Sequence, residues 1–351
     1  MSLWPVYTGG GQPHDGITQL PPPPPWRAFN GRPLLPPPAE DPDDAASSPD
    51  RTHRAQTYVV TDQSVELVNA ALYLRRPLLV TGPPGSGKSS LPYAVARELM
   101  LGPVLRWNVT SRSTLDDGLY QYDPLSRLYA AREEPRPGVK VVARGEPVQR
   151  YSDIADHLRL GPLGTALLPH QRPRVLLIDE IDKGDLDLPN DLLNVLEEGQ
   201  FEIPELVRTA HREPRADVMV AGTDERVTLH RGRIRCHAFP FVVLTSNGER
   251  EFPPAFLRRC VTLELKQPDQ RQLKAIVEAH LGALDQDALE LVDTFLHRAS
   301  GGELATDQLL NAVYLTRTSG LQGPSREQLA EHLMPYLSQA LETEGPRPDE
   351  F

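Results

Sequence analysis

The chain has 351 residues, of which 39% are hydrophobic and 24% charged, a composition typical of a folded protein with one large domain or two modest ones. Its 48 acidic and 37 basic residues give a net charge of −11, which disfavours nucleic acid and anionic membranes as partners. No apolar run is long enough to span a bilayer, and Met1–Pro5 shows no signal-peptide pattern. Two separate cysteines, Cys236 and Cys260, predict neither a disulfide framework nor a zinc site, so we expect a cytoplasmic protein.

Residues 1–56 differ in composition from the rest of the chain. Thirteen of the 36 prolines fall within the first 50 residues, including an uninterrupted run at 21–25. Because proline lacks an amide donor and disfavours helices and central strands, we expect a disordered Pro-rich tail. Such a tail could be a ligand for a proline-binding groove, but a solvated tail is the favoured interpretation.

Residues 57–267 alternate between apolar strands and helices. Short apolar runs predict buried strands at 78–81, 104–110, 175–178 and 241–245. Helices are expected at 62–76 (with Asp62 as N-cap), 90–101, 117–131, 151–158 and 188–199, with a weak strand at 139–143 and hairpins at 201–237. This alternation predicts an α/β domain with a parallel sheet flanked by helices.

From about residue 268 the pattern is helical alone. Helices are expected at 269–281, 286–299, 306–318 and 325–343, the last opening with a capping box of Ser325 and Gln328. We therefore expect a small all-helical lid domain at residues 268–345.

The glycine-rich stretch Gly82-Pro83-Pro84-Gly85-Ser86-Gly87-Lys88-Ser89 lies between the strand at 78–81 and a helix that opens at Ser90. That is the P-loop arrangement, in which the glycines let successive backbone N–H groups face a phosphate chain at a helix N-terminus. Lys88 would reach the β- and γ-phosphates, and the Ser89 hydroxyl would bind Mg²⁺. The sequence predicts that residues 82–90 bind a nucleotide.

Two acidic residues, Asp179 and Glu180, directly follow the buried strand at 175–178. Such a strand delivers side chains to the carboxyl edge of a parallel sheet, where ligands bind. Asp179 is placed to orient Mg²⁺ and to help bind the nucleotide, and Glu180 to polarise the attacking water.

Two further features complete the predicted catalytic set. Asn247 follows the strand at 241–245, where a neutral amide can hydrogen-bond both the water and the γ-phosphate. Arg258 and Arg259 follow a short helix, and from the residues alone they are either a surface pair or groups that project into a neighbouring subunit's nucleotide site.

The chain resembles the AAA+ ATPases in the order of GPPGSGKS, VLLIDEIDK, VVLTSN and FPPAFLRRC. It is similar more narrowly to the MoxR-like group in TSNGEREFPPAFLRRC, LNVLEEGQFEIPEL and LGPLGTALLP. The resemblance implies Walker A at Gly82–Ser89, Walker B at Asp179 and Glu180, sensor 1 at Asn247 and an arginine finger at Arg259, with Arg258 as neighbour or substitute. It also implies ATP and Mg²⁺ as cofactors, a homo-oligomeric ring that is commonly hexameric, and a helix-2 insert at 201–236.

The MoxR-like resemblance further implies chaperone-like remodelling of a protein client or partner, such as one with a von Willebrand factor A-type domain. Two positions depart from the group's pattern. The stretch 303–310 lacks the arginine that often serves as sensor 2, and Arg258 stands where an acidic residue is common.

Two functions follow from these features. The first is an ATPase that remodels a partner protein, and the alternative is an assembly switch in which ATP binding recruits a partner and hydrolysis only resets it. A GTPase is disfavoured because no Asn-Lys-x-Asp guanine reader is present, and a nucleic-acid motor because the chain has no basic stripe.

Overall fold

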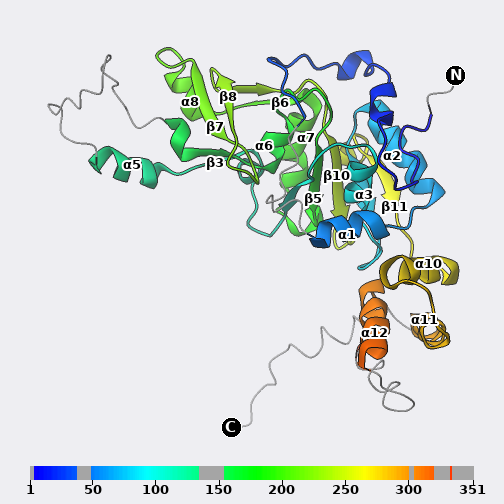
Figure 1. Cartoon of the computed structure of the whole chain (residues 1–351). Helices are drawn as coiled ribbons and strands as arrows, with labels where there is room; N and C mark the ends of the chain where they lie inside the picture. Colours follow the sequence, from blue (N-terminus) through cyan, green and yellow to red (C-terminus); the bar gives the residue numbers. More distant parts are fainter. Residues whose placement is uncertain (1–3, 38–48, 134–153, 300–303, 320–332, 334–351) are drawn as a thin grey trace, which may run out of the picture.

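The computed structural model of the chain describes residues 4–37, 49–133, 154–299, 304–319 and 333. Its centre is a five-stranded sheet with the order β11-β1-β10-β5-β2, in which every neighbouring pair is parallel (Figure 1). The strands are β1 (Leu78–Thr81), β2 (Leu105–Asn108), β5 (Val175–Asp179), β10 (Phe241–Ser246) and β11 (Val261–Glu264). The four predicted strands are thus confirmed within one or two residues, and β11 adds an edge.

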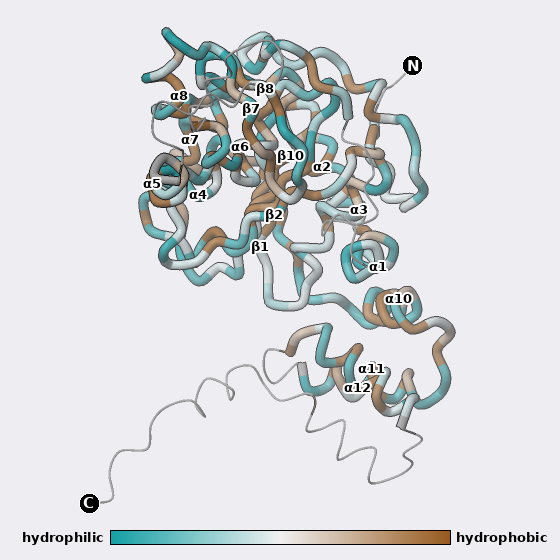
Figure 2. The backbone as a smooth tube through the Cα atoms, turned by 60° about the vertical axis from the view of Figure 1, so that its left-hand side comes forward, coloured by the Kyte–Doolittle hydropathy of each residue, from teal (hydrophilic) through white to brown (hydrophobic). Residues whose placement is uncertain are grey.

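Alternate residues of each central strand face opposite sides of the sheet. On β5, Val175 and Leu177 belong to one buried apolar cluster, and Leu176 and Ile178 belong to the other. Both β5 and β10 are buried at every residue, which explains their continuous apolar sequences. Figure 2 shows these apolar stretches in brown at the centre of the molecule.

Helices cover both faces of the sheet, so the predicted α/β fold is confirmed. Apolar residues of α2 and α3 join one cluster, and those of α6, α7 and α9 join the other. These helices are α2 (Asp62–Leu74), α3 (Leu91–Glu98), α6 (Pro162–Ala166), α7 (Leu188–Glu198) and α9 (Pro254–Leu257). The N-cap of α2 is Thr61, whose side chain accepts from Ser64 N–H, and Asp62 is the first helical residue rather than the cap.

A second, six-stranded sheet lies beside the first, with the order β3-β4-β7-β8-β9-β6. Its strands are β3 (Tyr120–Tyr122), β4 (Leu158–Leu160), β6 (Gln200–Glu202), β7 (Arg215–Met219), β8 (Arg226–His230) and β9 (Arg233–Arg235). The predicted hairpins at 201–237 are confirmed, with a short helix, α8 (Pro204–Thr209), between β6 and β7.

The predicted single helix at 117–131 is wrong. The segment forms α4 (Leu115–Leu119), then β3, then α5 (Pro124–Glu133). Strand β3 pairs with β4, and Pro124 starts a new helix because proline fits only the first turn. The helix expected at 151–158 is a 3₁₀ turn at Ile154–His157 followed by β4, while 151–153 and the strand expected at 139–143 lie outside the described residues.

The described parts of residues 1–56 differ from the expected disordered tail, because they lie against the folded domain. Residues 4–37, which we call the N-terminal strap, lie along the α/β domain, and Val6 and Tyr7 are buried. The buried Asn69 side chain accepts hydrogen bonds from the N–H groups of both residues and donates one to Tyr7 O. Residues 49–57 form helix α1 (Pro49–Thr57). An extended chain that cannot pair with itself is ordered here by polar side chains of the folded domain.

The C-terminal helices form a separate unit, as predicted. They are α10 (Gln270–Leu281), α11 (Gln286–Ala299) and α12 (Thr306–Ser319), and they share their own apolar cluster, which includes Leu273, Val292, Phe295 and Leu309. In Figure 1 this lid lies at the carboxyl edge of the sheet, next to α1. Apart from residue 333, the helix expected at 325–343 lies outside the described residues. None of the described helices is both long and apolar enough to cross a bilayer.

Candidate nucleotide-binding site

The loop between β1 and α3 has a backbone that only glycine adopts readily. Gly85 and Gly87 have φ angles of +72° and +87°. A Cβ at Gly82 would lie 2.3 Å from Leu265 O, and one at Gly85 would lie 2.7 Å from Thr306 N. The loop is therefore held closely between β11 and the lid, with no room for side chains at these two positions.

Lys88 lies within this loop. Its Nζ donates to Gly82 O and Pro83 O, each at 2.8 Å. Burial lowers the pKa of Lys88, while the negative charges of Asp182, Asp179 and Glu180 oppose that shift. Because an ammonium group has three donors, these two bonds leave one for a ligand. A phosphate oxygen bound there would give the partly buried ammonium a partner of opposite charge.

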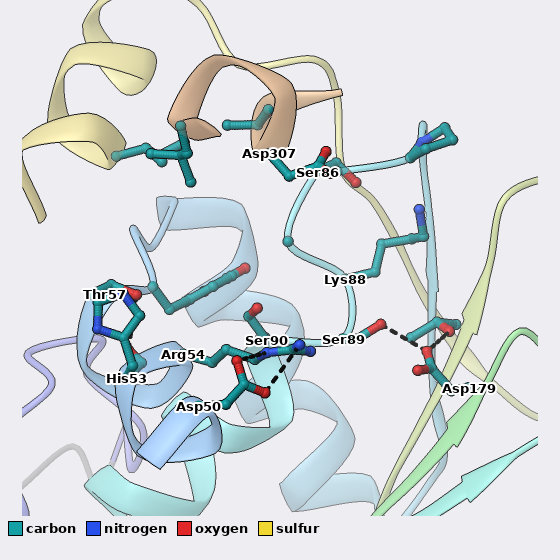
Figure 3. Close-up of a pocket in the computed structure, with 18 of the residues that line it drawn as sticks. Asp50, His53, Arg54, Thr57, Ser86, Lys88, Ser89, Ser90, Asp179 and Asp307 are labelled. Atoms are coloured by element: carbon teal, nitrogen blue, oxygen red, sulfur yellow. Dashed lines mark hydrogen bonds and ion pairs between the residues drawn. The ribbon is translucent and has the colours of Figure 1, made fainter. Parts of the chain in front are cut away.

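Asp179 is the centre of the polar contacts at the carboxyl edge of the sheet. Its Oδ1 accepts from Ser89 Oγ at 2.7 Å (Figure 3). The same oxygen accepts from Thr245 Oγ1 at 2.6 Å, and Oδ2 accepts from Arg106 Nη2 at 2.7 Å. Thr245 Oγ1 in turn accepts from Glu180 N–H at 2.9 Å. The P-loop and strands β2, β5 and β10 thus meet at one carboxylate.

The oxygen atoms gathered here fit a magnesium ion. Ser89 Oγ and Asp179 Oδ1 are 2.7 Å apart, and Mg²⁺ in phosphate sites takes a few protein oxygens together with water and phosphate oxygens. Asp179 is 6% exposed, so its carboxylate is held in place by its partners before any ion binds.

Glu180 directly follows β5 and Asn247 directly follows β10, and both line the cavity at this edge of the sheet. Glu180 has a positive φ of 59°, and its Oε1 forms an ion pair with Lys183 Nζ at 2.9 Å. That hydrogen bond raises the pKa of Lys183. Asn247 N–H donates to Asp182 Oδ2 at 2.9 Å, which fixes the backbone at the end of β10. The positive φ of Glu180 is uncommon for a non-glycine residue and is often found at functional sites.

A cavity of about 920 Å³ lies above these residues, between the sheet edge and the lid. It brings together most of the site residues predicted from sequence: Pro84, Gly85, Ser86, Gly87, Lys88, Ser89, Ser90, Asp179, Glu180 and Asn247. Gly82 and Pro83 lie at the start of the same loop and accept the Lys88 bonds.

Other lining residues were missed by sequence reasoning. They come from α1, the segment after it, β2, β10 and the lid, and include Asp50, His53, Arg54, Thr57, Tyr58, Arg106, Thr245, His280, Asp307 and Tyr314. Figure 3 shows the α1 side chains on one side of the cavity and Asp307 of the lid on another. His53 and His280 join α1 to α10 through a hydrogen bond of 3.0 Å. Arg106 and Thr245 could have been predicted from sequence, because each lies on an apolar strand that ends at this edge of the sheet. The α1 residues could not, because they lie in the proline-rich region.

Of the residues that the structure describes, neither Arg258 nor Arg259 lines this cavity. Both are exposed at the end of α9. Arg259 Nη1 donates to Ala255 O at 3.0 Å, and its Nε lies 3.6 Å from Glu197 Oε1. Arg258 O accepts from Arg76 Nη1. The structure therefore keeps both arginines apart from the nucleotide cavity of their own chain.

The parallel sheet, the glycine-rich loop and the acidic strand end define a P-loop nucleotide-binding protein. The chain matches the AAA domain (dynein-related subfamily) over residues 77–260, slightly more than half of its length, and it belongs to that family. Proteins of this family bind nucleotides and in general hydrolyse them.

Among solved structures, the chain is similar to NtrX from Brucella abortus in complex with ADP, with 15% identity and a TM-score of 0.36. The similarity covers 82% of this chain but only 57% of the NtrX chain. A comparison with curated protein sequences gives no match.

Proposed function

We propose that the protein is an ATP-hydrolysing AAA+ enzyme of the MoxR-like group that remodels a partner protein. The observation that carries the proposal is the convergence of Ser89, Thr245 and Arg106 on Asp179, directly under the cavity that contains Lys88 and Glu180. This set of groups suits a triphosphate with a divalent cation better than any uncharged ligand.

Each group has a role in phosphoryl transfer to water. The loop N–H groups and Lys88 bind the β- and γ-phosphate oxygens, and Asn247 orients the γ-phosphate and the water. Glu180 accepts a proton from the water while the water oxygen attacks γ-phosphorus and the bond to the β,γ-bridging oxygen breaks, which gives ADP and inorganic phosphate. Mg²⁺, held by Ser89 and Asp179, would neutralise the charge that develops on the phosphates.

The catalytic set is completed by a second copy of the chain in this proposal. Arg259 is exposed and lies outside its own cavity, so it can reach a nucleotide only in a neighbouring subunit. A guanidinium there stabilises the charge on the transferring phosphoryl group. We therefore propose a homo-oligomeric ring, a hexamer on the pattern of related ATPases, in which Arg259 acts as the finger and Arg258 lies beside it.

The alternative is an assembly switch, in which ATP binding recruits the partner and hydrolysis only resets the complex. The partner in either case is a protein, for which one with a von Willebrand factor A-type domain is our candidate. The cysteines of the described residues are both unpaired, in keeping with the cytoplasmic location that we propose. The two functions differ in whether turnover is needed for output.

Phosphate release by purified protein tests the proposal. Wild type should hydrolyse ATP, Glu180→Gln should bind ATP without turnover, and Arg259→Ala should bind normally but hydrolyse about 10³-fold more slowly or worse. Mixing Arg259→Ala with Lys88→Ala subunits should restore activity, because the first supplies an intact nucleotide site and the second an intact finger.

The result that separates the two functions is the biological output of Glu180→Gln. If this variant recruits its partner and retains full output, the switch is correct and the remodeler is wrong. Absence of ATP hydrolysis by the wild-type oligomer, with and without protein partner, would remove both.

A further inference from the structure

Arg27 of the N-terminal strap is only 3% exposed, although it carries a charge. Its guanidinium donates to Leu196 O and Glu197 O at the C-terminus of α7, each at 3.0 Å, and to Arg75 O at the end of α2. Burial lowers the pKa of Arg27, and the neighbouring charge of Glu197 opposes that shift. A cation at the C-terminus of a helix satisfies carbonyl groups that have no partner within the helix.

The surroundings hold this guanidinium rigidly. It lies over the rings of Phe239 and Phe29, at 4.6 and 5.3 Å from their centroids. The strap also approaches the end of α7 so closely that a Cβ at Gly199 would lie 2.6 Å from the Phe29 ring. With its five N–H donors directed at fixed carbonyls and a carboxylate, Arg27 has a single orientation.

Glu197 connects this buried arginine to the exposed one. Its Oε2 accepts from Arg27 Nη1 at 3.2 Å, and its Oε1 pairs with Arg259 Nε at 3.6 Å. One carboxylate therefore lies between two guanidinium groups, of which one is fixed in the interior and the other is 44% exposed at its side chain. Arg259 also donates to Ala255 O, so that two points of contact define its direction.

We propose that Arg27 is a positioning residue for the arginine finger: through Glu197, the proline-rich strap of one subunit sets the orientation of Arg259 toward the nucleotide of the next. This inference rests on the proposed function, because it takes Arg259 as a group that acts in trans. A carboxylate at the surface would otherwise rotate freely, and an exposed ion pair alone orders a long side chain only weakly. Fixing Glu197 from the interior removes that freedom before the neighbour binds.

Two substitutions test the connection from different sides. Arg27→Gln removes the fixed charge, and Glu197→Gln removes the carboxylate but keeps the strap contacts to the α7 carbonyls. Each should lower kcat by about 10- to 100-fold, as expected for a misplaced catalytic group, with KM for ATP unchanged. The double variant should be no slower than the worse single variant, because both break one connection. Arg27→Lys keeps the positive charge but loses the planar guanidinium with its several fixed donors. Its kcat should therefore lie between those of Arg27→Gln and wild type.

Mixed assemblies give a readout that loss of local structure would not produce. Arg27→Gln subunits keep their own nucleotide site, so mixing them with Lys88→Ala subunits, whose fingers are intact, should restore activity as it does for Arg259→Ala. The matched control is Arg75→Asn, which tolerates the left-handed backbone at this position and removes the Arg75 donation to Pro21 O of the strap without touching Glu197. It should leave kcat within about 2-fold of wild type, because the contacts of Arg27 with Glu197 remain.

The outcomes separate this inference from the function on which it rests. If Arg259→Ala is slow and is rescued in mixtures, but Arg27→Gln and Glu197→Gln turn over at the wild-type rate, the positioning role is wrong and the finger stands. Loss of ATP binding by Arg27→Gln, or an equal loss of kcat in Arg75→Asn, also overturns it. If Arg259→Ala itself hydrolyses normally, the proposed trans finger fails first.

Discussion

The carboxyl edge of the parallel sheet and the N-terminal strap are both ordered, but for different physical reasons. At the sheet edge, buried strands fix their own register, and the site residues follow from where the strands end, as with Asn108 beside Asp179. The strap has no strand partner of that kind along most of its length. It is ordered by a few buried polar groups, namely Asn69 and Glu98 of the folded domain and its own Arg27.

This difference predicts different consequences of mutation. The sheet edge is held by apolar burial on both faces, so a change in a ligand-binding side chain there should alter chemistry and leave the fold intact. The strap depends on single polar side chains, so one substitution should release a whole segment.

The largest effect is expected for Lys88→Ala at the sheet edge. Removing a charge that pairs with phosphate should weaken nucleotide binding by about 30-fold or more. The free energy of unfolding should stay unchanged or rise, because burial lowers the pKa of Lys88 and its ammonium is costly to keep in place. Calorimetric titration with ADP and thermal unfolding measure both quantities.

The matched control is Lys266→Ala, since Lys266 is exposed next to Leu265, which contacts the P-loop. It should bind nucleotide like wild type. Unchanged affinity in Lys88→Ala would contradict the P-loop assignment, and a large loss of stability would contradict the contrast between sheet edge and strap.

A smaller but still large effect is expected for Glu98→Ala, which removes the acceptor of the strap N–H groups of Thr8, Gly9 and Gly11. Glu98 is fully buried, and its carboxylate accepts from Thr8 N–H at 2.6 Å, Thr8 Oγ1 at 2.8 Å and Gly11 N–H at 2.9 Å. The free energy of unfolding should fall by about 3 kcal/mol or more, since buried donors lose a charged partner. Urea unfolding gives this value, and limited proteolysis should show early cleavage near residues 4–14.

The control on the same strap is Asp15→Ala. Asp15 pairs with Arg172 at the surface, and such a pair contributes about 0–1 kcal/mol. A strap that stays protected from protease in Glu98→Ala would show that apolar contacts of Val6 and Tyr7 are sufficient to hold it.

Acid should release the strap in the same way. Burial alone would raise the pKa of Glu98, but the hydrogen bonds from Thr8 and Gly11 outweigh it and hold the pKa below the ordinary value of 4.5. A carboxyl group whose pKa is lowered in the folded state stabilises the fold at every pH above its ordinary pKa. That contribution to the free energy of unfolding is lost as the pH falls from the ordinary pKa through the lowered one. Proteolysis of wild type at pH 7 and below pH 4.5 should show the change, and Glu98→Ala should show none at this segment.

The same contrast explains how much the sequence could predict. Gly82–Ser89, Asp179, Glu180 and Asn247 follow short apolar runs, and their position at strand ends is a local signal that needs no knowledge of distant residues. The family match over residues 77–260 covers this part of the chain. Fold class and the core of the site could therefore be predicted.

The strap could not be predicted, because its partners are distant in sequence. Asn69 is 62 and 63 residues along the chain from Tyr7 and Val6, whose N–H groups donate to it. Glu197 is 170 residues from Arg27. Proline content correctly indicates that the segment cannot form helices or sheet by itself. It carries no information about acceptors that a folded domain offers, which is also why the α1 side of the nucleotide cavity was missed.

The smallest effect is expected for Lys183→Met, which removes the ion pair of Glu180. Both side chains are about two-fifths exposed, at 42% and 43%, in contrast to the buried Arg27. A half-exposed pair is worth about 0–1 kcal/mol, so freeing the Glu180 carboxylate should raise kcat by at most about 5-fold. The rise is expected because the carboxylate must leave Lys183 to accept a proton from water.

Salt gives the independent check. Moderate salt screens exposed pairs, so it should raise the wild-type kcat toward that of Lys183→Met and leave the variant unaffected. A 10-fold or larger fall in kcat would instead make Lys183 part of the catalytic set. The changes in kcat of Arg27→Gln and Lys183→Met can then be compared. If burial determines how strongly a charge pair affects turnover, Arg27→Gln should change kcat more than Lys183→Met, although Lys183 contacts the catalytic carboxylate of Glu180 directly.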